Sequence, residues 1–168
     1  PSAAAAARRG AALHALFERL PGIEPGHRRA VGAAWIGAGW PDLDAAALVD
    51  LVLVILDDPR FAGVFALDAL SEAPVAAVVG GTVIAGTVDR LLVTDSDVTI
   101  VDFKTGRRVP ATAAAVEPYH LRQMAAYVAA LERIFPDRPV RALLLYTEGP
   151  ALIDLPDAII ALHRPQAD

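Results

Sequence analysis

The sequence lacks cysteine altogether and is poor in lysine and aromatic side chains. The absence of cysteine excludes disulfides, cysteine-based zinc fingers and cysteine-bound iron–sulfur clusters, and it is compatible with a bacterial cytoplasm. Lys104 is the single lysine among 15 lysine and arginine residues. Abundant alanine, arginine and glycine indicate a GC-rich genome, in which arginine is the easier choice. We therefore interpret the retained lysine as a chemical requirement.

Excess positive charge and long apolar runs are also missing. The formal charge is -5, which is unfavourable for binding nucleic acid unless a bound metal or a larger parent protein offsets it. The apolar run 73–88 is shorter than the ~20 residues of a membrane span, and Gly80-Gly81 interrupts it. The 168 residues suit one domain, and because they begin at Pro1 we expect a segment of a longer protein.

One stretch combines two aspartates with the lone lysine. We expect a β-hairpin with strands and turn at 87–93, 98–104 and 94–97. A symmetric turn places Asp89 opposite Asp102, and two carboxylates about 4.5–5.5 Å apart need a cation or a shared proton between them. Alternation places Asp102 and Lys104 on one face and Phe103 on the other. Carboxylates that hold a divalent metal beside an ammonium group favour hydrolysis at phosphorus.

The orientation of Asp89 decides between a buried site and a surface ion pair with a nearby arginine. Strand alternation groups Asp89 with Val83, Ala85 and Leu91, which we expect to face inward. This grouping favours the buried site.

The remaining pattern predicts an α/β domain with a mixed β-sheet flanked by helices. Residues 1–7 read as a frayed lead-in. Helices are expected at 9–20, 26–40, 41–56, 118–135 and 157–163, and strands at 74–79, 82–93, 98–103, 141–147 and 152–155. Asp42 or Asp44 is expected to cap the third helix. We divide the domain into an N-terminal helical layer, 1–65, and a core, 66–168.

A second polar pair lies in the expected helix 118–135. Gln123 and Tyr127 are four residues apart and so share one helix face. Glutamine can hydrogen-bond a phosphate, and tyrosine can stack or donate a hydrogen bond.

Five ordered motifs together resemble the RecB-like branch of the PD-(D/E)XK nucleases, and within it the C-terminal nuclease domains of AddA-type helicase–nucleases. The motifs are GAALHALFERLP with His14, SEAPV with Glu72, GTVDRL with Asp89, IVDFKTGR with Asp102 and Lys104, and QMAAY with Gln123 and Tyr127. The resemblance implies a restriction-endonuclease-like fold. Many relatives carry a four-cysteine iron–sulfur cluster, which this sequence cannot form.

The resemblance also implies roles for individual residues. Asp89 and Asp102 would bind Mg²⁺ or Mn²⁺ together with His14 and the Phe103 carbonyl, Lys104 would act on the attacking water and the phosphate, and Glu72 would be a supporting acid. Gln123 and Tyr127 would place DNA, and Arg107 and Arg108 are further candidates for holding phosphate. The implied setting is a DNA exonuclease in double-strand-break repair and recombination, joined to an ATP-dependent helicase and to an AddB-like partner subunit.

Three alternatives remain open at this point. The chain could be a stand-alone or phage-type exonuclease of the same superfamily. It could be a non-catalytic module that guides DNA or braces a partner, although Asp89, Asp102, Lys104 and Gln123 are all retained. A different metallohydrolase would normally show an HxH or HExxH motif, which is absent.

Overall fold

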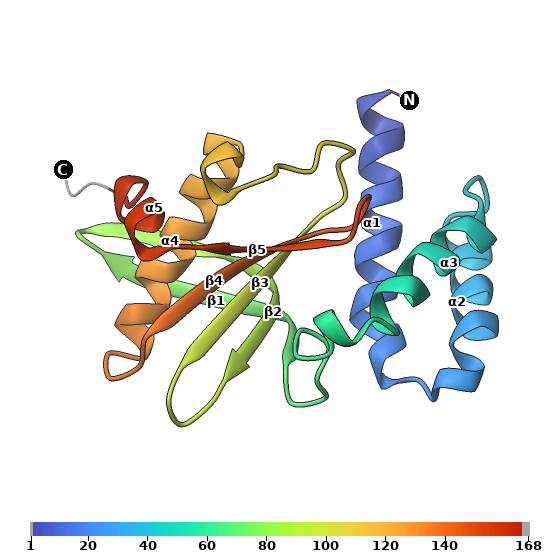
Figure 1. Cartoon of the computed structure of the whole chain (residues 1–168), viewed down its shortest axis with the longest axis horizontal. Helices are drawn as coiled ribbons and strands as arrows, with labels where there is room; N and C mark the ends of the chain where they lie inside the picture. The colour runs from blue at the N-terminus through green and yellow to red at the C-terminus, as the bar shows by residue number, and fades with distance from the viewer. Residues whose placement is uncertain (1, 166–168) are drawn as a thin grey trace.

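A five-stranded mixed β-sheet forms the centre of the computed structural model, which describes residues 2–165 (Figure 1). The strands are β1 (Leu70–Val79), β2 (Thr82–Val93), β3 (Val98–Lys104), β4 (Val140–Tyr146) and β5 (Ala151–Leu155), and they lie side by side in chain order. Only the β3–β4 pair is parallel, because helix α4 lies in the crossover between these strands. The other neighbours pair antiparallel through short turns.

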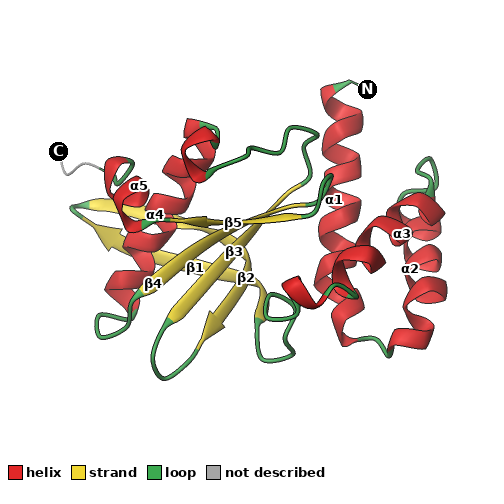
Figure 2. Cartoon of the chain, viewed as in Figure 1, coloured by secondary structure: helices red, strands yellow, loops and turns green. Residues whose placement is uncertain are grey.

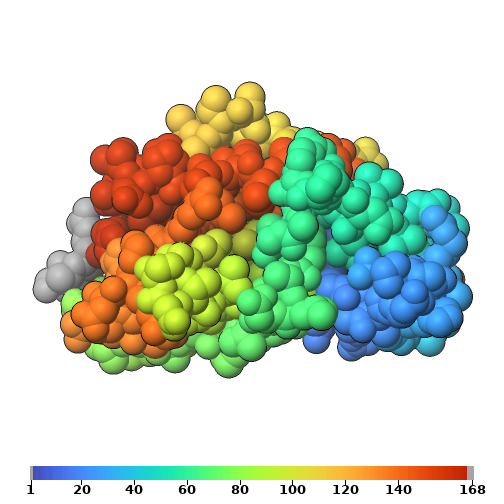
Figure 3. Space-filling view, turned by 60° about the horizontal axis from the view of Figure 1, so that its bottom comes forward, coloured from blue at the N-terminus to red at the C-terminus, as the bar shows by residue number. Residues whose placement is uncertain are grey.

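The helices fall into an N-terminal group and a C-terminal group (Figure 2). The first contains α1 (Ala3–Arg19), η1 (Leu20–Gly22), α2 (Pro25–Gly39), α3 (Ala45–Leu56) and η2 (Pro59–Phe61). The second contains η3 (Ala113–Ala115), α4 (Pro118–Ile134) and α5 (Asp157–Leu162). In the space-filling view of Figure 3, the N-terminal helices form one end of the molecule, and the segment around η2 lies between them and the strands.

Helix α1 begins earlier than the sequence pattern predicted. The Ser2 hydroxyl accepts a hydrogen bond from Ala5 N–H at 3.2 Å, and the helix starts at Ala3. Alanine is the best helix former, so a capped alanine run continues the helix instead of fraying. The expected lead-in was therefore wrong for residues 3–7. At α3 the cap is Asp44, whose Oδ1 accepts from Ala47 N–H at 3.0 Å.

Each face of the sheet covers its own apolar core. Val98, Ile100 and Leu144 pack with Met124 of α4 on one face. On the other face, Phe103 packs with Phe17 of α1 and with Phe65, at ring-centroid distances of 5.1 and 5.8 Å. Helices on both faces of a mixed sheet confirm the predicted α/β architecture.

Strand β2 departs from the expected alternation in the middle of its length. Val83 is 72% exposed and Ala85 is also exposed, whereas Val88 and Leu91 lie in the same core. Two residues three apart share a face only if the alternation shifts between them. The prediction that Val83 and Ala85 face inward with Asp89 was therefore wrong.

The neighbouring strand is distorted at the same level. Glu72 of β1 lies between the paired residues Ser71 and Ala73, and its φ of 48° places it in the left-handed region. Such a backbone is uncommon for a residue other than glycine and is a form of local strain found at functional sites. The two distortions turn the Glu72 and Asp89 side chains out of the regular pleat.

Among residues 2–165, no helix is both long enough and apolar enough to cross a membrane.

Candidate active site

The β2–β3 hairpin has the predicted register. Arg90 pairs with Val101 and Val93 with Val98, so Asp89 and Asp102 fall opposite one another at the next position. Regular pairing between the strands ends there, and Phe103 N–H donates to Asp89 Oδ2 at 2.5 Å. The Asp89 carboxylate thus accepts the hydrogen bond that a backbone carbonyl of β2 would accept if the β2–β3 pairing continued. Asp89 and Asp102 are both buried, with 9% and 8% of the residue exposed.

Three side chains that could bind a metal ion converge at one point: His14, Glu72 and Asp89. Each offers one ligand atom, and these three atoms lie within 4.8 Å of one another. His14 Nδ1 lies 2.9 Å from Asp89 Oδ1. Helix α1 brings His14 to the sheet, where its ring meets the edge of Phe103 at a centroid distance of 5.7 Å. One imidazole nitrogen and two carboxylates are a donor set that suits a divalent cation. The residues present therefore fit the metal that the sequence implied.

Electrostatics in this group favour a positive charge at its centre. Burial alone would lower the pKa of His14, but its hydrogen bond to Asp89 and the surrounding carboxylates raise that pKa overall. Burial, followed by the charge of Asp89, raises the pKa of Glu72. Carboxylates that are crowded in this way repel one another unless a cation lies among them.

Asp102 contacts Lys104, with which it shares a face of β3. Lys104 Nζ lies 2.6 Å from Asp102 Oδ2 and 3.3 Å from Gln123 Oε1, which projects from α4. Burial raises the pKa of Asp102, and the nearby Lys104 opposes that effect. The third member of the group with His14 and Asp89 is therefore Glu72. Asp102 lies outside this group and pairs with Lys104. The Phe103 backbone contributes an N–H to Asp89.

Tyr127 braces the site from α4 and is largely buried, with 8% exposed. It packs directly against Gly86 of β2, where a Cβ atom would collide with the Tyr127 hydroxyl. Burial and then the Asp102 charge raise the pKa of Tyr127, partly offset by hydrogen bonds to Gln123 and to the Thr87 backbone. Gln123 and Tyr127 therefore share a face, as predicted, and together connect Lys104 with the core.

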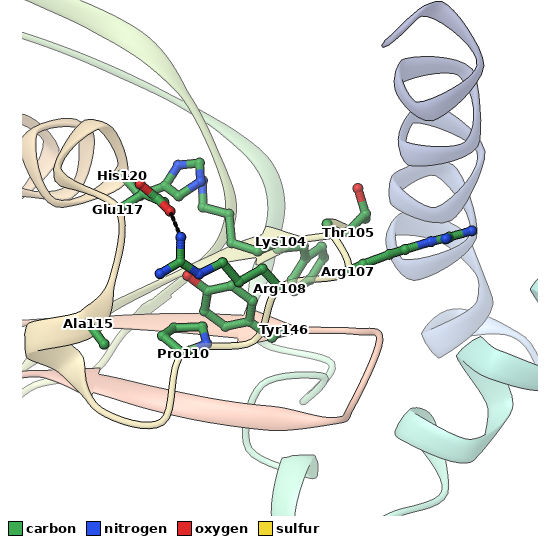
Figure 4. A pocket seen from close by; sticks show the side chains of 11 residues that line it. Lys104, Thr105, Arg107, Arg108, Pro110, Ala115, Glu117, His120 and Tyr146 are labelled. Atoms are coloured by element: carbon green, nitrogen blue, oxygen red, sulfur yellow. Dashed lines mark hydrogen bonds and ion pairs between the residues drawn. The ribbon is translucent and has the colours of Figure 1, made fainter. Parts of the chain in front are cut away.

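A hollow of about 440 Å³ opens on the other side of Lys104 (Figure 4). Arg108 turns across it and donates to Glu117 at 2.7 Å, whereas Arg107 extends toward α1. Tyr146 and His120 also line this hollow, and the sequence offered no role for Tyr146. Tyr146 is the neighbour of Lys104 across the parallel β3–β4 pair. No local pattern shows such a pairing, because the two strands are separated by the α4 crossover.

The family model for the PD-(D/E)XK nuclease superfamily matches residues 1–163. The chain belongs to this superfamily. Its name describes an aspartate followed later by Asp or Glu, any residue and Lys, which here are Asp89 and Asp102-Phe103-Lys104. Members of the superfamily generally use divalent metals, which agrees with the donor set described above.

A solved structure shows the same fold at low sequence identity. The crystal structure of a "putative exonuclease" from Eubacterium rectale superposes with a TM-score of 0.59 and 12% identity, over 88% of this chain and 62% of that one. A structure of SSO0001 shares 17% identity over 77% of this chain and 66% of that one, with a TM-score of 0.36. This chain therefore spans less than two thirds of the length of either structure. A comparison with curated proteins finds no match.

Proposed function

We propose that this domain is a deoxyribonuclease that hydrolyses phosphodiester bonds with Mg²⁺ or Mn²⁺. The observation that carries the proposal is the half-buried Asp102–Lys104–Gln123 contact, placed beside the His14–Glu72–Asp89 group. A half-buried lysine held between a carboxylate and an amide is preorganised, so its ammonium can meet a phosphate without reorganisation. The superfamily membership supports the same chemistry.

Each side chain has a defined task in this proposal. His14, Glu72 and Asp89 would hold the divalent cation, with Asp102 beside them, and a bound cation supplies Lewis-acid polarisation and neutralises charge on the phosphate. The Phe103 N–H and His14 orient the Asp89 carboxylate. Lys104 positions the attacking water and stabilises negative charge on the phosphate. Water adds to phosphorus, the bond from phosphorus to a sugar oxygen breaks, and the water proton ends on the leaving oxygen.

The biological setting is also a proposal. We propose an exonuclease joined to an ATP-dependent helicase of the AddA type, with an AddB-like partner subunit, acting on DNA in double-strand-break repair and recombination. The ordered motifs from His14 to Tyr127 support it, and so does the fold shared with the Eubacterium rectale structure. A helicase would deliver strands to the site, which compensates for the net charge of -5.

Cleavage of linear single- and double-stranded DNA with Mg²⁺ or Mn²⁺ tests the reaction. We expect metal-dependent cutting that Asp102→Asn abolishes, because the variant removes the charge paired with Lys104 and keeps the shape. Asp95→Asn is the matched control, since Asp95 is exposed in the turn of the same hairpin. Equal cutting by wild type and Asp102→Asn would refute the assigned site. No cutting by the full-length parent protein would refute the nuclease function.

A further inference from the structure

The hollow beyond Lys104 has the electrostatics of an anion site. Lys104 and Arg108 contribute positive charge to its lining, Arg107 lines it while its guanidinium extends toward α1, and Glu117 is the single acidic residue among the lining residues. The whole chain carries -5, so this local excess of positive charge is not a property of the surface in general. A volume of about 440 Å³ lies in the range of ligand pockets, roughly 300–1,000 Å³.

Helix α4 adds to this preference for an anion. Glu117 is its N-cap residue and lines the hollow together with His120 of the first turn. The N-terminus of a helix carries a partial positive charge and favours negative groups. His120 lines the hollow, and its Nδ1 is buried without a hydrogen-bond partner among residues 2–165. The pKa of His120 is lowered by burial and by Lys104, so the imidazole is neutral near pH 7 and contributes no charge of its own to the hollow.

The Glu117 carboxylate already occupies the position that an external anion would need. Arg108 Nη1 donates to Glu117 Oε1 at 2.7 Å, with side-chain exposures of 80% and 53%. Arginine binds carboxylates and phosphates through the same planar fork of donors. An exposed pair of this kind is held weakly and can be exchanged for another anion.

We infer that this hollow binds a phosphate group of a DNA strand, and that Glu117 competes with that phosphate for Arg108. The inference rests on the proposed function and deepens it, because the hollow adjoins the site and shares Phe103 and Lys104 with it. Two sources share the chemistry: an internal phosphodiester and the phosphate at a 5′ end. A 5′-terminal phosphate in this position would place the first bond of the strand at the site.

Binding measured without metal tests the inference separately from cleavage. The probe is a ten-nucleotide thymidine strand with a fluorophore at its 3′ end, followed by fluorescence anisotropy in EDTA over a series of salt concentrations. Arg108→Gln should weaken binding about three- to tenfold and reduce the salt slope by about 0.7, the value for one phosphate contact on single strands. Glu117→Gln should tighten binding about two- to fivefold, because it releases Arg108.

Arg29→Gln is the matched control, since Arg29 is an exposed arginine of α2 that also pairs with an exposed acid, Asp50. It should leave the affinity unchanged. The affinities of a probe with a 5′ phosphate and a probe with a 5′ hydroxyl are then compared. If the 5′ phosphate tightens binding and Arg108→Gln removes the difference, the bound group is the phosphate at the 5′ end. Equal affinities of the two probes, both weakened in Arg108→Gln, identify an internal phosphate.

Opposite effects of Arg108→Gln and Glu117→Gln would support the inference, whereas weaker binding in both variants would overturn it by assigning Glu117 a structural role. Unchanged binding in both, or no binding by wild type, would also overturn it. If the pattern is found but the full-length parent protein cuts no DNA, the nuclease function alone is refuted. If DNA is cut but the pattern is missing, this inference alone is refuted.

Discussion

The substitution Gly86→Ala adds one carbon atom and tests how closely Tyr127 packs against β2. A Cβ atom at Gly86 would lie 2.8 Å from Tyr127 Cε1 and 3.0 Å from Cζ, and closer still to the hydroxyl oxygen. The Tyr127 ring is part of the core between α4 and the sheet, so it cannot swing aside freely. We therefore expect Gly86→Ala to displace Tyr127 and, with it, the Gln123 that contacts Lys104.

The magnitude follows from two opposing effects. Forcing an extra carbon into a packed core costs about 1–3 kcal/mol. Alanine in place of glycine recovers about 0.4–1 kcal/mol by restricting the unfolded chain. Taken at the middle of these two ranges, the expected net loss in the free energy of unfolding is about 1–2 kcal/mol. For a chain of 168 residues, that loss lowers Tm by about 2–8 °C.

Urea unfolding of Gly86→Ala beside Gly37→Ala measures this effect. Gly37 lies inside α2 with no atom within 4 Å of its added Cβ, so alanine there should stabilise the protein by about 0.5–1 kcal/mol. Tyr127→Phe in the Gly86→Ala background should recover only part of the loss, because Cε1 and Cζ remain. If Gly86→Ala stabilised the protein as Gly37→Ala does, the contact with Tyr127 would be refuted.

Two further variants test the helix cap and the crowding of carboxylates. Asp44→Ala should lower the free energy of unfolding by about 1 kcal/mol, because it removes the α3 cap. Asp42→Ala, at an exposed position, should change it by less than about 0.5 kcal/mol. A larger loss for Asp42→Ala than for Asp44→Ala would contradict Asp44 as the cap. Because burial and Asp89 raise the pKa of Glu72, its ionisation opposes folding, so in EDTA Glu72→Gln should become more stable than wild type as the pH rises through that pKa. The difference should vanish below the ordinary value of 4.5, and equal unfolding curves at pH 7 would refute the reasoning.

The β2–β3 hairpin could be predicted because its determinants are local. A four-residue turn between two β-branched strands sets the register, and the register alone placed Asp89 opposite Asp102. The pairing of Lys104 with Asp102 follows from alternation in the same way. Composition and periodicity were likewise sufficient for the mixed sheet with helices on both faces.

Predictions failed where neighbouring strands changed the backbone. Alternation placed Val83 and Ala85 inward, but β2 changes phase near Asp89, opposite the left-handed Glu72. A single strand cannot reveal this shift, because it arises between two paired strands. The prediction for the alanine run before Arg9 failed for another reason. Alanine has a strong helix propensity, but we expected frayed ends at the start of the chain, and the helix begins at Ala3.

The sequence by itself determined which chemical groups are present and which of them lie close together along one element. It supplied the DxK arrangement on β3, the helical spacing of Gln123 and Tyr127, and the lone lysine. Only the tertiary structure decided that Glu72 joins His14 and Asp89, and that Tyr146 lies beside Lys104. Both groupings join segments that are distant in the chain. Packing of α1 against the sheet and the crossover through α4 create them, and no local pattern encodes either contact.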